Sequence, residues 1–130
     1  MNFQNLRLTA KPNQYLVAPE GLCAGAKPHL AAPEFAVAPA ALRARFRDVA
    51  LAQPRVILAG ADDAALTDIY VQRSALLGFP DTVTVQFLAA GTGRSSLAIY
   101  SRSRYGYSDL GVNKARIDTW LRKLAAKCPA

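Results

Sequence analysis

TVTVQFLAAGTGRSSLAIYSRS (residues 82–103) contains two predicted strands joined by a tight glycine turn, and this hairpin decides the fold. In the first strand Val83, Val85 and Phe87 alternate with polar residues, which is the period of two expected for a strand with one buried face. The second strand is predicted at Ser95–Ser103, after a turn that carries two glycines. Because the connection is short, the two strands must run antiparallel.

Two more strands are predicted upstream of this hairpin, at Val56–Ala59 and Asp68–Leu77, again separated by turn residues. A helix before them begins at Pro39, because the first turn of a helix does not need the N–H that proline lacks. It ends near Gln53, before the next proline. Short connections make all four strands antiparallel neighbours.

The chain ends in a second predicted helix, which begins at Asn113, a good N-cap residue. Its apolar stripe consists of Ile117, Trp120, Leu121 and Leu124. The order helix, four strands, helix predicts an α+β domain at residues 39–130. We expect a four-stranded antiparallel sheet with two helices packed on one face.

Residues 1–38 are expected to form an irregular arm that wraps this domain. Four prolines and two glycines interrupt the segment, so neither a helix nor a long strand can persist there. Its apolar residues can still cover a sheet edge: Leu16, Val17, Leu22, Phe35 and Val37. A chain of 130 residues is therefore expected to be one globular unit.

The net charge of +7 lies almost entirely in the last third of the chain. Residues 94–130 hold eight Lys or Arg and two Asp, whereas the first 93 residues hold eight basic and seven acidic side chains. The resulting local field favours a phosphate, an anionic lipid headgroup or an acidic protein as partner. No apolar run approaches the ~18 residues that span a bilayer, and residues 1–10 lack the apolar block of a signal peptide.

SRSRYGYSDLGVN (residues 101–113) concentrates side chains that bind anions. Arg102 and Arg104 share parity, so on an extended strand both point to one face and can form a fork for a phosphate or carboxylate. The segment leads into a helix N-terminus, where free N–H groups and the positive dipole end favour anions. Arg116, one turn into that helix, adds a third donor.

The remaining residues of this segment have supporting roles in the hypothesis. Asp109 orients the arginines, Ser108 and Asn113 cap the helix backbone, and Tyr105 lines the ligand site. The alternative is purely structural, with Asp109 holding one arginine in an internal ion pair.

Arg73 is a further candidate anion donor, because it completes an apolar row of the second predicted strand. That row comprises Ile69, Val71, Ala75 and Leu77. A charge in such a row needs a partner, either Asp81 or Asp109. Alternatively, Arg73 lies near the end of the sheet and extends outward, or a bulge reverses the face.

Recognisable catalytic, metal and cofactor motifs are missing from the chain. His29, the one histidine, lies in the arm, and nothing resembles a nucleophile elbow. Cys23, His29 and Cys128 lack the paired spacing of a zinc site. An enzyme that uses Asp81 or Asp109 as a general base beside the arginines is one alternative function.

Two further possibilities concern the cysteines and nucleic acid. Cys23 and Cys128 form a disulfide in an oxidising compartment or stay free thiols in a reducing one. Tyrosines interleave with Arg102 and Arg104, as in a stacking platform for single strands. No known nucleic-acid-binding signature accompanies them, so nucleic acid is disfavoured as a partner.

Several motifs carry a family resemblance. They are SRSRYGYSDLGVN followed by Lys114, Arg116 and the helix Ile117–Leu124, together with VQRS (71–74) and FPD (79–81). With them the chain resembles, over about Pro12–Leu124, the bacterial and plastid family called domain of unknown function 1499. The resemblance implies no activity, cofactor or substrate. It does imply a periplasmic or membrane-associated location in a bacterium, with a cytoplasmic one as the alternative.

The predicted function is therefore binding of an anionic small molecule or lipid headgroup through the Arg/Ser/Tyr-rich loop of residues 101–113, with no cofactor. Besides the general-base enzyme, a second alternative is a protein-interaction module. It would use the basic C-terminal helix to contact another protein. A membrane surface is the other alternative partner.

Overall fold

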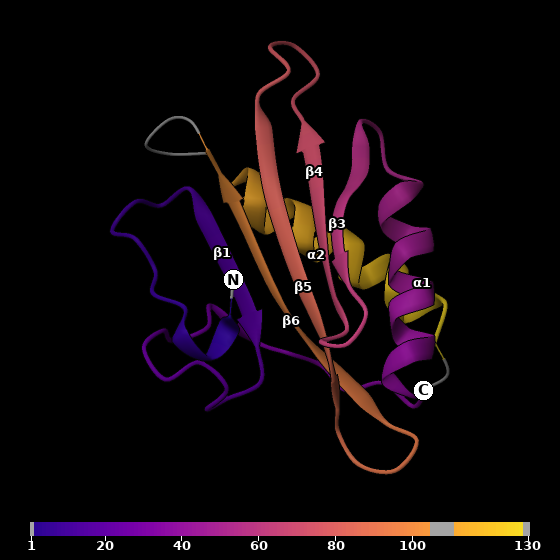
Figure 1. Cartoon of the computed structure of the whole chain (residues 1–130). Helices are drawn as coiled ribbons and strands as arrows, with labels where there is room; N and C mark the ends of the chain where they lie inside the picture. Colours follow the sequence, from indigo (N-terminus) through magenta and orange to yellow (C-terminus); the bar gives the residue numbers. More distant parts are fainter. Residues whose placement is uncertain (1, 105–110, 129–130) are drawn as a thin grey trace.

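The computed structural model describes residues 2–104 and 111–128, which form one sheet and two α-helices (Figure 1). The strands are β1 Gln14–Ala18, β2 Leu30–Ala31, β3 Val56–Asp62, β4 Thr67–Arg73, β5 Pro80–Ala89 and β6 Ser95–Ser103. The helices are α1 Pro39–Leu51 and α2 Val112–Ala126, and a 3-10 turn, η1, spans Phe3–Asn5. The spatial order of the strands is β2-β1-β6-β5-β4-β3. β1 and β2 run parallel, and the other neighbours run antiparallel.

The α+β class is confirmed, but the sheet has six strands rather than four and is mixed rather than purely antiparallel. The additional strands, β1 and β2, come from the segment expected to be an irregular arm. β1 fits between Pro12 and Pro19, because five residues are enough to pair with β6. Leu16, Val17 and Ala18 of β1 are fully buried, which stabilises the pairing.

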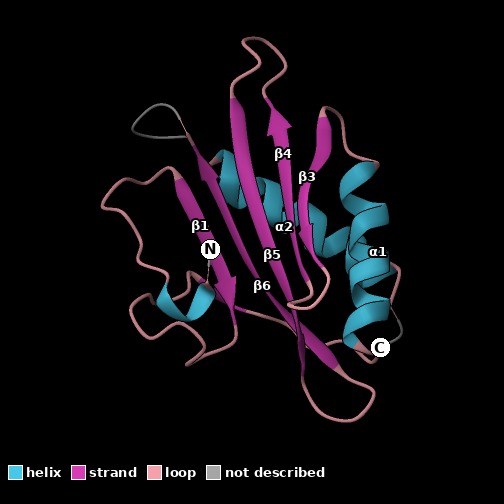
Figure 2. Ribbon diagram, in the orientation of Figure 1, coloured by secondary structure: helices cyan, strands magenta, loops and turns pink. Residues whose placement is uncertain are grey.

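Both helices pack against one face of the sheet, here called the helix face, as predicted. Figure 2 shows α2 crossing the sheet and α1 lying on its β3 side. Phe46 of α1 meets Trp120 of α2 edge-on, with ring centroids 5.9 Å apart. Tyr70 of β4 meets the same indole at 6.1 Å and 85°. The aromatic cluster thus joins both helices to the sheet.

The predicted β5–β6 hairpin is confirmed, and its strands pair in continuous register over their length. Val83, Val85 and Phe87 face the helices and are buried. Thr82 and Thr84 lie on the opposite side of the sheet, here called the open face.

The strand predicted at Asp68–Leu77 is wrong in both its length and its buried face. β4 ends at Arg73, and the helix face receives Asp68 and Tyr70 instead of the expected apolar row. Ile69 lies on the open face. Charge pairing is the reason: two arginines of α1 neutralise Asp68, so the polar side chain can be buried.

Two other predicted elements need only small corrections. The first helix ends at Leu51, two residues before the predicted Gln53. The strand predicted at Val56–Ala59 continues to Asp62 through an irregularity between Leu58 and Gly60.

The N-terminal segment covers part of the open face. Phe3 of η1 and Leu6 pack on three buried residues of the sheet, which are Leu16, Ala98 and Tyr100. This second, smaller core holds the arm beside β1 (Figure 1). In the described part of the chain, neither helix has the length and apolar character required to cross a bilayer.

Candidate functional site

The strand register aligns the open face into rows of side chains that run across the sheet. One row consists of Gln14 (β1), Arg102 (β6), Thr82 (β5), Val71 (β4) and Ile57 (β3). The next row consists of Leu16, Tyr100, Thr84 and Ile69. Cationic and hydroxyl groups therefore lie directly beside a more apolar floor.

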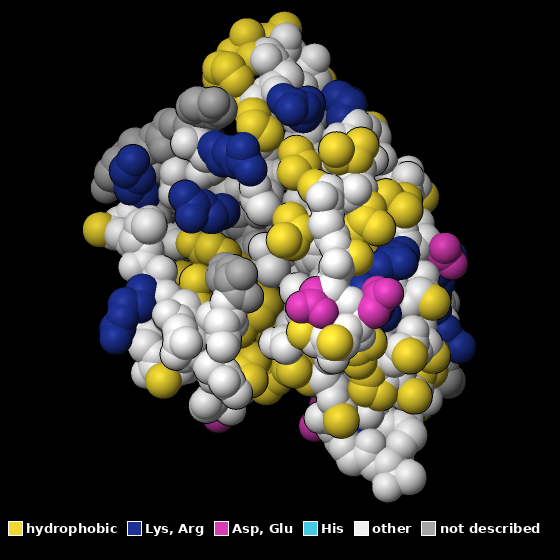
Figure 3. Space-filling model, viewed as in Figure 1, with side chains coloured by type: hydrophobic (Ala, Val, Ile, Leu, Met, Phe, Trp, Pro, Cys, Tyr) yellow, Lys and Arg dark blue, Asp and Glu magenta, His cyan; other side chains and the backbone are white. Residues whose placement is uncertain are grey.

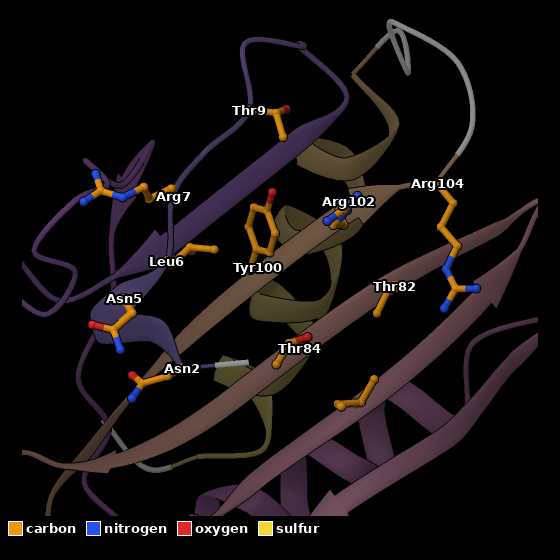
Figure 4. Close-up of a pocket in the computed structure, with 11 residues that line it drawn as sticks. Asn2, Asn5, Leu6, Arg7, Thr9, Thr82, Thr84, Tyr100, Arg102 and Arg104 are labelled. Atoms are coloured by element: carbon orange, nitrogen blue, oxygen red, sulfur yellow. The ribbon is translucent and has the colours of Figure 1, made fainter.

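A groove of about 740 Å³ lies over these rows, between the N-terminal arm and β4 (Figure 4). Arg102 and Arg104 line the same groove, so the prediction that they project to one face is confirmed. Figure 4 shows the Arg104 side chain extending past Thr82. A second hollow of about 590 Å³ shares Asn2 and Ile69 with the groove and continues it along the open face.

The two groove arginines are exposed to solvent. Neither guanidinium of Arg102 or Arg104 donates a hydrogen bond to, or forms an ion pair with, a residue in the described ranges 2–104 and 111–128. Space-filling Figure 3 shows Lys and Arg side chains gathered on this face, on the side of β1 and β6. A concave surface with free cations attracts anions.

Gln14 holds the arm that forms one wall of the groove. Its side-chain amide donates to the Thr9 carbonyl at 2.6 Å and to the Lys11 carbonyl at 3.0 Å. Its carbonyl oxygen accepts from the Tyr100 hydroxyl, and burial raises the pKa of Tyr100. One buried side chain therefore joins the arm loop to β6.

Arg7 also lines the groove but is not aimed at its cationic end. Figure 4 shows its guanidinium turned away from Arg102 and Arg104. The guanidinium lies over Gly25, where even a Cβ would come within 2.9 Å of Nη1. Arg7 therefore supports the arm rather than the anion site.

Arg116 and Asn113 lie on the helix face, on the side of the sheet away from the groove. Arg116 Nη2 is 2.6 Å from Asp81 Oδ2, and Nη1 donates to Ser101 Oγ at 3.0 Å and to Asn113 Oδ1 at 2.7 Å. Its Nε donates to the Gln72 side chain. Because these acceptors occupy the guanidinium, Arg116 is not the third anion donor that the sequence suggested.

Asn113 was predicted to be the N-cap of α2, and this prediction is wrong. The cap is Gly111, with φ of 81°, and Asn113 lies inside the first turn. Its amide nitrogen donates to the Asn13 carbonyl and to Ser103 Oγ, both at 3.0 Å. The side chain is fully buried and ties α2 to the residue before β1 and to β6.

Arg73 lies at the end of β4 and is exposed, in agreement with the outward alternative. Its Nη1 donates to the Gly78 carbonyl at 2.9 Å. The expected ion pair with Asp81 is not formed, because Asp81 is engaged by Arg116. Tyr105, Ser108 and Asp109 lie outside the described residues.

Sequence reasoning missed a buried charge cluster between α1 and β4. Asp68 is fully buried and lies 2.8 Å from Arg43 Nη2 and 2.7 Å from Arg47 Nη2. The Tyr70 hydroxyl donates to the same carboxylate at 3.0 Å. Burial opposes its charge, but the hydrogen bonds from Arg47, Arg43 and Tyr70 hold the pKa of Asp68 below its usual range. The available signal was the spacing of the arginines, one turn apart on α1.

Cys23 and Cys128 are both free thiols in this structure. Cys23 packs against the small core on the open face, whereas Cys128 packs against the main core on the helix face. The sheet separates them, so the possible disulfide is not formed. Burial raises the pKa of the Cys23 thiol.

His29 has a structural contact in the arm. Its Nδ1 accepts the backbone N–H of Leu16 at 2.9 Å, and its ring stacks on Tyr15 with centroids 5.0 Å apart. The imidazole thus supports β1.

Comparison with curated proteins and with solved structures finds no match. The family model described as Protein of unknown function (DUF1499) matches residues 7–124, which include most of the arm, the whole of β1 to β6 and most of α2. The chain belongs to this family of proteins of unknown function.

Proposed function

We propose that the protein binds a small organic anion, carrying a phosphate or carboxylate, in the groove on the open face. The observation that carries the proposal is that Arg102 and Arg104 line this groove without a hydrogen bond or ion pair to any residue of the described ranges. Arginine forks match the oxygens of a phosphate or carboxylate. A volume of about 740 Å³ suits a ligand of metabolite size.

The rest of the lining supports an organic ligand rather than a bare ion. Thr82 and Thr84 place hydroxyls beside the arginines, and Leu6 and Ile69 add apolar surface further along the groove. An anion with an apolar portion would contact both the cationic end and the apolar end of the groove. The adjoining hollow extends the space past Ile69 and so accommodates a longer apolar chain.

The same phosphate chemistry belongs to a soluble phosphoester and to a lipid headgroup. Calorimetry with inorganic phosphate, glycerol 3-phosphate and dihexanoyl phosphatidic acid separates these sources. A lipid site binds the phosphatidic acid more tightly than glycerol 3-phosphate, because only the acyl chains reach Ile69 and the second hollow. A site for soluble phosphoesters binds both equally.

The decisive variant is the double substitution Arg102→Gln, Arg104→Gln. Each lost charge-assisted contact is worth about 1.5–3 kcal/mol, so affinity should fall by 100-fold or more. Arg122→Gln is the matched control, because Arg122 is an exposed arginine of α2. If the double variant binds as the parent does, the proposed site is wrong.

The two alternative functions receive less support. Asp81 is paired with Arg116 on the helix face, away from the groove, so it is poorly placed as a general base beside free arginines. On α2, Arg116 is engaged in the polar cluster and Lys114 pairs with Asp118, which leaves fewer cations for a protein partner. An envelope location rests on the family resemblance alone, and fractionation of the producing cells tests it.

A further inference from the structure

The loop between β4 and β5 presents an unusual amount of apolar surface to solvent. Leu76 is 90% exposed and Leu77 65%, and Phe79 is 48% exposed. Figure 3 shows apolar side chains at the tip of the molecule where this loop lies. We call Leu76, Leu77 and Phe79 the apolar tip.

Hydrogen bonds hold this loop in a defined shape. Ser74 N donates to the Phe79 carbonyl at 3.0 Å, and Gly78 N donates to the Ser74 carbonyl at 3.1 Å. Ser74 Oγ accepts from Phe79 N at 3.1 Å, and Gly78 adopts φ of 67°. The leucines are therefore presented by a closed turn at the end of a β-hairpin.

Two arginines lie at the base of the apolar tip. Arg73 donates to the Gly78 carbonyl, and Arg55 Nε donates to the Arg73 carbonyl at 2.9 Å. Within residues 2–104 and 111–128, neither arginine forms an ion pair with a carboxylate. The register places Arg73 opposite Pro80, and Asp81 opposite Ser103, so β6 ends at the same end of the sheet.

We propose that this end of the molecule docks on an anionic phospholipid bilayer. The apolar tip enters the interfacial layer, and Arg55 and Arg73 contact the headgroup phosphates. A bilayer fits better than a protein partner, because a convex apolar tip with two arginines at its base, neither of them ion-paired within residues 2–104 and 111–128, matches a layer of acyl chains under a layer of anions. The docking surface uses none of the groove arginines, so its failure would not affect the proposed groove ligand.

Binding to vesicles tests this proposal. The parent protein should cosediment with vesicles of 30% phosphatidylglycerol in phosphatidylcholine and bind pure phosphatidylcholine much less. Leu76→Ser, Leu77→Ser should lower the partition coefficient at least tenfold, because both side chains lose their apolar burial. Leu30→Ser is the matched control, since Leu30 is 43% exposed at the β2 edge of the sheet.

The charge contribution has its own pair of variants. Arg55→Gln, Arg73→Gln should lower the partition coefficient about 25-fold, or about fivefold for each arginine, and the loss should shrink at high salt. Arg122→Gln should bind the same vesicles as the parent does within about fivefold. Far-ultraviolet circular dichroism confirms that each variant is folded.

Fluorescence of Leu76→Trp reports where the tip lies. Its emission should shift to shorter wavelength with phosphatidylglycerol vesicles and be quenched by brominated lipid, whereas buried Trp120 should not respond. Absence of binding, equal binding by the Leu76/Leu77 and Leu30 variants, or an unquenched Leu76→Trp would each overturn the proposal. Binding of the apolar tip to a purified protein partner, with no vesicle binding, would overturn it as well.

Discussion

At the residue scale, the Asp68 carboxylate is the centre of a buried network of charges. It is fully buried and bonded by Arg43, Arg47 and Tyr70. Asp68→Asn leaves Arg47 without its carboxylate partner and leaves Arg43 with only the exposed Asp63, so the free energy of unfolding should fall by about 3–5 kcal/mol. Urea denaturation at pH 7 measures the loss. Asp48→Asn, on the exposed side of α1, should change it by less than about 0.5 kcal/mol.

The same carboxylate predicts how stability depends on pH. The pKa of Asp68 is lower in the folded protein than in the unfolded chain. Between these two pKa values, the unfolded chain therefore binds more protons than the folded protein does. Its stabilisation is complete above about pH 4–5 and is lost as pH falls through the lower, folded-state pKa. The gap in unfolding free energy between parent and Asp68→Asn should therefore shrink in acid. A constant gap from pH 7 to pH 2 would contradict this account.

Arg116 provides a residue-scale test of which arginines serve structure and which serve binding. Arg116→Gln removes the partner of Asp81 and should cost about 3 kcal/mol of unfolding free energy, since both side chains are mostly buried. The folded variant should still bind the groove ligand, because Arg116 lies on the helix face. If Arg116→Gln lost binding but kept its stability, Arg116 would be a binding residue rather than a structural one. Chemical denaturation and calorimetry on one preparation give both quantities.

At the element scale, the N-terminal arm depends on Gln14. Gln14→Leu removes the amide that holds the Thr9 and Lys11 carbonyls and the Tyr100 hydroxyl. Amide exchange at Thr9, whose N–H donates to Gln14 Oε1, should accelerate, and trypsin should cut after Arg7 faster than in the parent. Gln53→Leu, two residues after the end of α1, is the matched control and should leave cleavage of the arm unchanged.

Elements with clear periodicity were predictable from the sequence, and elements set by distant partners were not. The β5–β6 hairpin and the apolar stripe of α2 follow from local alternation and helical spacing. β1 escaped prediction because flanking prolines mask a five-residue strand that exists only through its pairing with β6. The buried face of β4 was mistaken because Asp68 is buried by arginines far along the chain.

The candidate site was predictable only in part, for a related reason. Parity placed Arg102 and Arg104 on one face, but it could not show that Arg116 approaches the sheet from the other side. The wall of the groove comes from the arm, whose contacts involve residues 86 and more positions apart, such as Gln14 with Tyr100. Local patterns carry no information on such contacts.

At the scale of the whole molecule, the reactivity of the two thiols tests whether the sheet keeps the two cores apart. Cys23 and Cys128 lie on opposite sides of the sheet, so no bond joins them while the chain is folded. Under non-reducing conditions, denatured protein should add two alkyl groups by mass spectrometry. In the folded protein, Cys23 should react slowly, because burial raises the pKa of its thiol. A protein whose mass is lower by two hydrogen atoms and which resists alkylation would contain a disulfide, and this result would contradict the arrangement.

The pairing of β1 with β6 has a consequence for biosynthesis. β1 leaves the ribosome before β6, and it cannot pair with that strand until more than eighty further residues have been translated. Until then Leu16 and its neighbours are exposed on a nascent chain, and β6 emerges with an unpaired edge. Slow closure by this N-terminal strand would leave a window for misassembly, in which holdase chaperones should raise the yield of native protein.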